Sequence, residues 1–272
     1  MICGLIHPGS GLGNMLHRYI ATRIKALELG VDFSIINPQG FKGKSFMNLD
    51  MGRKEDISYF VEQDTGKIIC FIEGLNNWEE WDKHTYDPDW NFVEDNTIID
   101  GSFEDPRYFE HKLPEIKEWL TTEILEFPDD VCIIGFRGGE YYTVPELGLP
   151  KEYFYSAIEK MLEINPNMKF EVHTDDSELA KQFFPFYPIT KNISINWRAM
   201  RYAKYAIIAN SSFYVLPRLL AHETRVGLIP SDRYPGTTYV KNTITIAPRY
   251  WNRYNTKKWD YPQGYYKSFQ YI

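Results

Sequence analysis

The opening segment of the chain constrains its fold more strongly than any other. An apolar run at residues 2–7 leads into a glycine loop at 8–14, a helical pattern at 15–29 and a second apolar run at 31–36. Apolar side chains in the helical stretch recur on one stripe, and Gly30 follows where a left-handed residue would end the helix. Strand, helix and strand in this order form a βαβ unit, whose two strands lie parallel in one sheet.

The rest of the chain repeats this alternation, most cleanly after the turn cluster at 128–130, which favours a domain boundary there. Further strands are predicted at 67–72, 131–136, 168–173, 193–195, 206–209, 226–229 and 243–246, and further helices at 106–127 with an interruption near Pro114, at 151–164, 175–184 and 197–205, and from 211 to 222. We therefore predict an α/β fold with two Rossmann-like domains facing across a cleft. They cover residues 1–127 and 128–250, and a tail at 251–272 packs back on the N-terminal half.

Charge and cysteine content exclude several protein classes. The net charge of -7 argues against a nucleic-acid-binding protein built on a basic surface. The three cysteines include no CxxC pair, which argues against a disulfide framework or a zinc ribbon, and Cys3 and Cys132 lie in apolar runs typical of buried free thiols. No apolar run approaches the ~18 residues of a membrane span, and the N-terminus lacks a basic signal-peptide region. We expect a cytoplasmic protein, with peripheral membrane contact left open.

The glycine loop does not match the common nucleotide fingerprints. In Gly9-Ser10-Gly11-Leu12-Gly13 the spacing differs from the G-x-G-x-x-G motif, no acidic residue closes the second strand, and no Gly-Lys-Ser/Thr follows as in a P-loop. What remains is a tight turn whose backbone can approach a ligand closely. A turn that needs glycine for its geometry alone is the alternative.

Polar residues follow three predicted strands of the second half, and α/β sheets bind ligands at the carboxyl ends of their strands. After the first strand, Arg137 stands between apolar and glycine residues and can grip a pyrophosphate with its planar fork, although a surface pair with Glu140 is an equal alternative. After the second, the carboxylates of Asp175 and Asp176 can hold ribose hydroxyls or a base edge. Alternatively, Thr174 or Asp175 caps the helix that follows.

The third of these strands is followed by Asn210-Ser211-Ser212-Phe213. Hydroxyls and unpaired N–H groups at a helix start are a favourable arrangement for phosphate, and a serine that only caps the helix is the alternative. Aromatic residues, 16% of the chain, gather at 78–90, where they either stack on a sugar acceptor or pack beneath a long loop.

Short motifs stand in a preserved order along nearly the whole chain, at residues 11–15, 100–109, 135–141, 149–153, 173–176, 207–213 and 247–251. In that order they resemble G-G-L-G-N-Q, D-G-Y-x-Q-S-x-x-Y-F, H-I-R-R-G-D-Y, L-P-x-x-Y-Y, F-S-D-D, I-I-A-N-S-T-F and A-P-x-x-W. These motifs are those of the α-1,2-fucosyltransferase-type glycosyltransferases, which have the GT-B fold. The resemblance therefore implies a GT-B glycosyltransferase.

The resemblance also implies a substrate class and a set of roles. A sugar, fucose from GDP-fucose in the typical case, moves with inversion and without metal or cofactor to a hydroxyl of an oligo- or polysaccharide acceptor. Arg137 would contact the donor pyrophosphate, Asp176 the nucleoside, and Ser211 and Ser212 the phosphates. The donor-binding residues expected in this way are Gly11, Gly13, Asn14, Arg137, His173, Asp175, Asp176, Asn210, Ser211, Ser212 and Phe213.

The chain departs from the family pattern at four positions. Gly135 stands for the family's His, Gly138 for its second Arg, Glu140 for its Asp and Asn196 for an acidic residue. These changes keep two alternatives open: a transferase that uses another nucleotide sugar, and a non-catalytic nucleotide- or carbohydrate-binding protein of the same fold. An enzyme that modifies nucleotide sugars by nicotinamide chemistry would need a cofactor fingerprint, and we find none in the sequence.

Transfer of a sugar to a hydroxyl needs a base that takes the acceptor proton. Glu140, His7 and Glu73 are the candidates, in this order, because we expect each to lie at a strand end that faces the cleft. Arg137 and the helix start at Ser211 would stabilise the departing diphosphate. The expected catalytic residues are Arg137, Glu140 and His7, and we expect no metal site.

Overall fold

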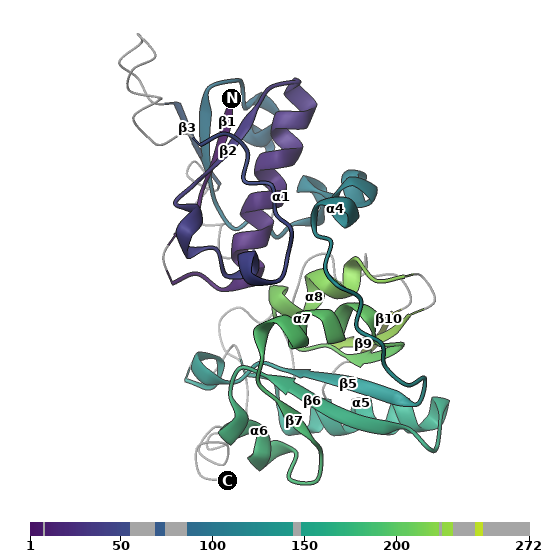
Figure 1. The fold of residues 1–272 in the computed structure, drawn as a ribbon. Helices are drawn as coiled ribbons and strands as arrows, with labels where there is room; N and C mark the ends of the chain where they lie inside the picture. The colour runs from purple at the N-terminus through teal and green to yellow at the C-terminus, as the bar shows by residue number, and fades with distance from the viewer. Residues whose placement is uncertain are drawn as a thin grey trace. The chain divides into compact units, whose positions relative to one another are not determined.

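The computed structural model describes residues 1–7, 9–54, 69–73, 86–143, 148–222, 225–230 and 243–246. The chain divides into two compact units, Met1–Thr122 and Glu123–Ile272, each with its own parallel sheet (Figure 1). The boundary that the sequence predicts after residue 127 lies a few residues beyond this division. The predicted tail at 251–272 lies outside the described residues.

In the first unit, the described strands form one parallel sheet in the order β2-β1-β4-β3. The strands are β1 (Ile2–Leu5), β2 (Phe33–Ile36), β3 (Ile69–Ile72) and β4 (Thr97–Asp100). The helices are α1 (Leu12–Leu29) and α4 (Leu113–Trp119), with 3-10 turns η1 (Pro38–Gly40), η2 (Lys42–Ser45), η3 (Pro88–Phe92), η4 (Pro106–Tyr108) and η5 (Glu110–Lys112).

The βαβ unit predicted from the opening segment is confirmed. β1 pairs in parallel with β2, and α1 packs on both strands (Figure 1). Gly30 ends α1 at φ 67°, the left-handed conformation that glycine adopts without strain. From β2 the chain crosses to the other side of β1, so the strand order reverses between β1 and β4. The carboxyl ends of these two strands flank the first topological switch point.

In the second unit, the described strands form a parallel sheet in the order β10-β9-β8-β5-β6-β7. The strands are β5 (Val131–Phe136), β6 (Lys169–Thr174), β7 (Ile189–Thr190), β8 (Tyr205–Ile207), β9 (Val226–Pro230) and β10 (Thr243–Ile246). The helices are α5 (Lys151–Ile164), α6 (Ser177–Phe183), α7 (Ile193–Tyr202) and α8 (Ser212–Leu219), with the 3-10 turn η6 (Gly139–Tyr142).

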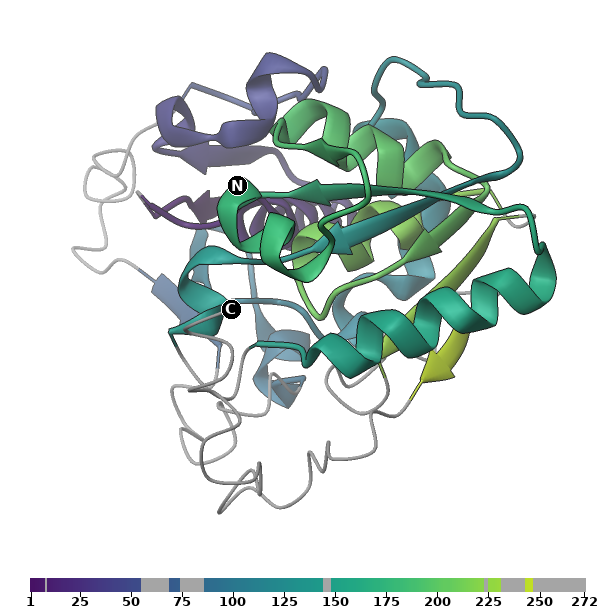
Figure 2. The same ribbon diagram turned by 90° about the horizontal axis from the view of Figure 1, so that it is seen from below.

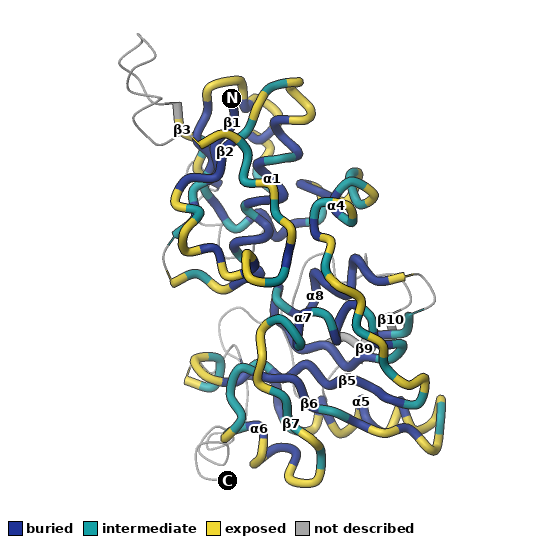
Figure 3. Tube along the Cα trace, in the orientation of Figure 1, coloured by how far each residue is buried: buried dark blue, intermediate teal, exposed yellow. Residues whose placement is uncertain are grey.

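The central strand β5 organises this unit. It is buried along its whole length, as Figure 3 shows, because α5 covers one face of the sheet and α7 with α8 covers the other (Figures 1 and 2). From β5 the chain adds β6 and β7 on one side, then returns and adds β8, β9 and β10 on the other. The second switch point therefore lies between the carboxyl ends of β5 and β8.

Most of the predicted elements are confirmed, and β5, α5 and β10 have the predicted bounds. The strand predicted at 193–195 is wrong, because these residues form the first turn of α7. The side chain of Asn192 accepts a hydrogen bond from the backbone N–H of Ile195 at 3.0 Å and caps that helix. Two β-branched residues suggested a strand, but the capping asparagine determines the local structure.

The long helix predicted at 106–127 is also wrong. The segment contains η4, η5 and the short helix α4, which ends at Trp119, and residues 121–128 have no regular structure. Pro114 lies in the first turn of α4, where its missing N–H costs nothing because first-turn N–H groups have no intrahelical acceptor.

Aromatic residues serve the core of the first unit. Trp90 is buried, and its ring centroid lies 5.3 to 5.5 Å from those of Phe71, Phe103 and Tyr108. For Trp90 the packing alternative therefore holds, and residues 74–85 lie outside the described part of the chain. Cys3 and Cys132 are buried free thiols, as predicted.

Candidate active site

Arg137, which directly follows β5, is held by two carboxylates. Its guanidinium donates to Asp175 and, at 3.0 Å, to Oε1 of Glu140, and it lies 5.0 Å from the centroid of the Tyr141 ring. The side chain is 24% exposed, and its Nε is buried without a hydrogen-bond partner among the described residues. The guanidinium is thus fixed at the second switch point, with its charge balanced by Asp175 and Glu140.

The two aspartates that follow β6 hold the glycine loop after β5. The backbone N–H of Gly138 donates to Asp175 at 2.8 Å, and that of Gly139 donates to Asp176 at 3.1 Å. The other oxygen of Asp176 accepts from Leu179 and caps α6, so the cap is Asp176 and not Thr174 or Asp175. The predicted residues Arg137, Glu140, Asp175 and Asp176 therefore form one cluster.

Gly138 fits this loop because it has no side chain. A Cβ at Gly138 would lie 2.5 Å from Cβ of Asp176, so the arginine that stands here in the motif that the sequence resembles has no room. The cluster consequently carries one guanidinium beside three carboxylates. A phosphate group that approaches Arg137 therefore also meets the negative charges of Asp175 and Glu140.

The start of α8 forms the other side of the second switch point. Asn210, Ser211 and Ser212 are buried, and Ser211 is the N-cap residue. Its side chain makes no capping hydrogen bond, so the hydroxyl does not satisfy the first-turn N–H groups of the helix. Phe213 packs edge-on against Trp197, at 5.9 Å between ring centroids.

His173 lies on β6 next to Gly135 of β5 and is buried, with 1% exposure. Its Nδ1 lies 3.1 Å from Oδ1 of Asn196, whose amide nitrogen donates to the carbonyl of Thr174 at 2.9 Å. An amide oxygen only accepts, so Nδ1 carries the imidazole proton. Burial lowers the pKa of His173 to about 4. The imidazole is therefore neutral at pH 7 and ties β6 to α7.

The first switch point contains a histidine–carboxylate pair. Nε2 of His7, just after β1, lies 2.8 and 2.9 Å from the two carboxylate oxygens of Asp100, the last residue of β4. Arg18 of α1 donates to the carbonyl of Gly101 at 2.6 Å and lies 3.3 Å from Oδ1 of Asp100. The backbone N–H of Gly101 also donates to that oxygen, at 2.9 Å. The carboxylate of Asp100 is thereby fixed from three sides.

The glycine loop lies beside this pair. Gly9 has φ 85°, and a Cβ at Gly9 or Gly11 would meet nothing within 4 Å. Gly11 is the N-cap residue of α1, so no side chain caps this helix. Gly13 and Asn14 lie in its first turn. The backbone at the carboxyl end of β1 is therefore open to close approach by a ligand.

Glu73, directly after β3, is 2% exposed and holds the loop after β4. One of its carboxylate oxygens accepts from the backbone N–H groups of Ser102 and Phe103, at 2.6 and 2.9 Å, and from the Ser102 hydroxyl at 2.9 Å. Its other oxygen has no hydrogen-bond partner in the described residues. The buried carboxylate of Glu73 thus fixes the backbone of the loop that follows β4.

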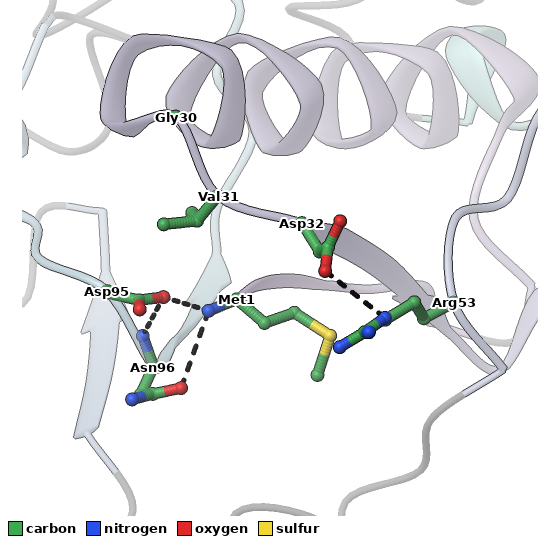
Figure 4. A pocket seen from close by; sticks show the side chains of 7 residues that line it. All are labelled: Met1, Gly30, Val31, Asp32, Arg53, Asp95 and Asn96. Carbon is green, nitrogen blue, oxygen red and sulfur yellow. Dashed lines mark hydrogen bonds and ion pairs between the residues drawn. The ribbon is translucent and has the colours of Figure 1, made fainter.

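Figure 4 shows a pocket of about 470 Å³ at the opposite end of the first sheet, where the strands begin. The amino group of Met1 pairs with Asp95 there, and Arg53 pairs with Asp32 at 3.2 Å. None of the predicted site residues lines this pocket. Parallel sheets bind ligands at the carboxyl ends of their strands, so we do not assign the active site to it.

Two residues of this geometry, Asp100 and Arg18, were not among the predicted site residues. Asp100 could have been found by the strand-end argument that singled out Arg137. Arg18 stands four residues after Asn14, hence on the same face of α1.

Among the described residues, no three histidine, cysteine or carboxylate side chains gather closely enough to ligate a metal ion. None of the described helices has the length and hydropathy needed to cross a bilayer.

No protein-family model and no curated protein sequence matches the chain. Among solved structures it is similar to E. coli heptosyltransferase WaaC with ADP, with a TM-score of 0.50, 12% identity, and coverage of 91% of this chain and 93% of that one. It is also similar to a glycosyl transferase family 9 protein from Veillonella parvula DSM 2008 (TM-score 0.47, 13% identity, coverage 91% and 85%) and to fucosyltransferase NodZ from Bradyrhizobium (TM-score 0.44, 14% identity, coverage 81% and 93%). The likeness to the heptosyltransferase is one of fold, and it confirms the predicted GT-B class of α/β protein.

Proposed function

We propose that this protein is a glycosyltransferase that moves a sugar from a nucleotide donor to a hydroxyl of an oligo- or polysaccharide acceptor. The observation that carries the proposal is the second switch point of a parallel sheet, where Arg137 follows β5 and the start of α8, which has no side-chain cap, follows β8. Sheets of this kind bind nucleotides at that position. The GT-B fold is consistent with the proposal, but a fold alone does not assign an activity.

The donor diphosphate is held by two groups in this proposal. Arg137 exchanges a carboxylate partner for a phosphate oxygen, and the first-turn N–H groups of α8 with the Ser211 hydroxyl receive a second oxygen. Both groups stabilise the negative charge that develops on the leaving diphosphate. Single displacement with inversion and without metal is what the resemblance to the α-1,2-fucosyltransferase type implies for the reaction. Asp175 and Asp176 hold the loop and line the nucleoside side.

GDP-fucose is the first donor to test, because the motif order resembles the α-1,2-fucosyltransferase type. An ADP-sugar is the second candidate. The specific observation in its favour is that Gly135, Gly138 and Asn196 depart from that family's motifs, while the heptosyltransferase with the similar fold binds ADP. Asn196 is buried and hydrogen-bonded to His173 and Thr174, so we do not assign its amide to recognition of the nucleobase.

The test is a thermal-shift screen with GDP, ADP, UDP and CMP and their sugars, with and without EDTA. A ligand at about 100 times its Kd stabilises the folded protein by roughly 2.7 kcal/mol, which is readily measured. We expect one nucleotide to stabilise the wild type, with EDTA making no difference, and Arg137→Ala to lose the shift.

Arg198→Ala is the matched control. Arg198, on α7, pairs with Glu123 at 2.9 Å, and its side chain is partly buried like that of Arg137. Arg198 does not lie at the switch point. It should keep the full shift. Failure of every nucleotide to stabilise the wild type would exclude the transferase and favour a carbohydrate-binding protein of this fold.

A further inference from the structure

We propose that the pocket at the end of the first sheet where its strands begin is a binding site for a neutral saccharide (Figure 4). The choice of a saccharide as ligand rests in part on the proposed function, because a glycan is the acceptor of that reaction. The pocket itself belongs to the first unit alone. It therefore binds its ligand whether or not a sugar donor is present.

The pocket is built by segments that lead into three neighbouring strands of the sheet. β1, β2 and β4 stand side by side in the order β2-β1-β4. Met1 precedes β1, residues 30–32 precede β2, and residues 95–96 precede β4. Arg53 completes the lining from a segment that lies along β2. The volume of about 470 Å³ is in the range that small ligands occupy in proteins.

Hydrogen bonds of the backbone hold this lining in place. The N–H of Arg53 donates to the carbonyl of Phe33 at 2.9 Å, and the N–H of Asn96 donates to the side chain of Asp95 at 2.8 Å. Gly52 has φ 72°, and a Cβ there would clash with the carbonyl oxygen of Phe33, so only glycine lets the Arg53 segment approach β2 this closely. A lining that is already ordered lowers the entropic cost of binding a ligand.

The charges in the pocket are balanced in pairs. Nε of Arg53 pairs with Asp32 at 3.2 Å, and the amino group of Met1 pairs with Asp95. In Figure 4 the side chain of Met1 lies between these two pairs. Each carboxylate thus has a cationic partner, so the pocket offers little net charge to an anion or to a metal ion.

The remaining polar groups alternate between donors and acceptors. The terminal nitrogens of Arg53, the second oxygen of Asp32 and the amide nitrogen of Asn96 make no hydrogen bond within the part of the chain that the structure describes. The side chains of Arg53 and Asp32 are 57% and 61% exposed, so a ligand can reach them. Sugar hydroxyls both donate and accept, and a planar guanidinium or carboxylate can contact two of them at once. An apolar ligand would leave these groups without partners.

The first measurement is binding of the full chain to an array of oligosaccharides that are neutral, bear carboxylates or bear amines. We expect binding to neutral members. The strongest neutral binder is then titrated into ¹⁵N-labelled protein, where the backbone signals of Val31, Arg53 and Asn96 should shift most. Binding to charged members only, or to no member of the array, would overturn the proposal.

The second measurement is the Kd of that oligosaccharide for variants of the lining. Arg53→Gln and Asp32→Asn should each raise the Kd about tenfold, since each loses hydrogen bonds to a charged group. Asn96→Gly should raise it about fivefold, and glycine tolerates the φ of 58° that Asn96 adopts. An exposed ion pair contributes little to stability, so the urea midpoints of Arg53→Gln and Asp32→Asn should stay close to that of the wild type.

Arg107→Gln is the matched control. Arg107 also lies in the first unit, is 55% exposed and pairs with Asp105 at 2.7 Å, but it does not line the pocket. Its loss should change the Kd by less than about twofold. A Kd that is unchanged in both Arg53→Gln and Asp32→Asn would place the saccharide elsewhere and refute the proposal.

The outcome separates this site from the proposed transferase activity. Stabilisation by a nucleotide without binding of any saccharide would refute the pocket as a saccharide site and leave the transferase in place. Saccharide binding that depends on Arg53, without stabilisation by any nucleotide, would support the pocket and refute the transferase.

Discussion

Tyr214 fills the space beside Gly135. A Cβ at Gly135 would lie 2.8 Å from Cδ1 of Tyr214 and 2.7 Å from Cε of Met200. The hydroxyl of Tyr214 donates to the carbonyl of His173 at 2.8 Å and lies 3.1 Å from that of Phe136, so it links β5 and β6. The absence of a side chain at position 135 therefore makes room for the buried ring of Tyr214.

This relationship predicts that Gly135→Ala destabilises the protein. The added methyl overpacks a full site, and we expect a loss of about 1–3 kcal/mol in the free energy of unfolding measured with urea. Because Tyr214 supplies one of the two close contacts, the loss should shrink in a Tyr214→Leu background. Gly40→Ala, where a Cβ meets nothing within 4 Å, is the control. Equal losses in both backgrounds would show that the two positions are not coupled.

Removing the cap of α6 should also destabilise the second unit. Asp176→Ala leaves the N–H groups of Leu179 and Gly139 without their side-chain acceptor, and we expect a cost of about 1–2 kcal/mol in urea unfolding. Asp176→Asn should cost less, because its amide oxygen can still cap the helix. Similar costs for the two variants would contradict a capping role.

Stability should depend on pH through His173. Its pKa is about 4 in the folded protein and about 6.5 when unfolded, so between these values the unfolded chain binds more protons. The stabilisation is present above pH 6.5 and is lost as the pH falls toward 4, by about 3 kcal/mol at most. His173→Gln should be less stable than the wild type at pH 7 and should show a smaller loss between pH 7 and 4.5. Parallel urea-midpoint profiles for the two proteins would contradict this assignment.

Glu140→Gln should tighten the binding of the nucleoside diphosphate. The carboxylate of Glu140 is 72% exposed and competes with phosphate for Arg137, so its loss should lower the Kd by up to about fivefold in calorimetry. Glu163→Gln is the control, since Glu163 pairs with Lys160 in the same i,i+3 spacing on α5. Weaker binding in Glu140→Gln would mean that Glu140 contacts the ligand directly.

The cysteines should differ in reactivity. Cys70 is exposed, whereas Cys3 and Cys132 are buried, and burial raises the pKa of Cys132. We expect a thiol reagent such as DTNB to modify Cys70 in the native protein and all three cysteines in urea. Rapid native modification of Cys132, identified by mass spectrometry, would contradict the burial of β5.

The periodicity of the sequence was sufficient for the parallel α/β class, because buried strands and amphipathic helices differ in the spacing of their apolar residues. It therefore located β5 and α5 to the residue. It failed at residues 193–195, where the cap of Asn192 starts a helix, and at 106–127, where the helix ends already at Trp119. Apolar periodicity alone does not show where a helix begins and ends.

The candidate site divides in the same way. Strand-end position alone singled out Arg137, Asp175, Asp176 and Ser211, since residues that follow parallel strands meet at one edge of the sheet. The pairing of His7 with Asp100 joins residues 93 positions apart, and Tyr214 beside Gly135 joins residues 79 apart. Such pairs depend on strand order and side-chain packing, which no local window of sequence contains. The sequence thus determined most of the helices and strands and the edge of the sheet at which the polar residues gather. The tertiary structure decided which of these side chains contact one another.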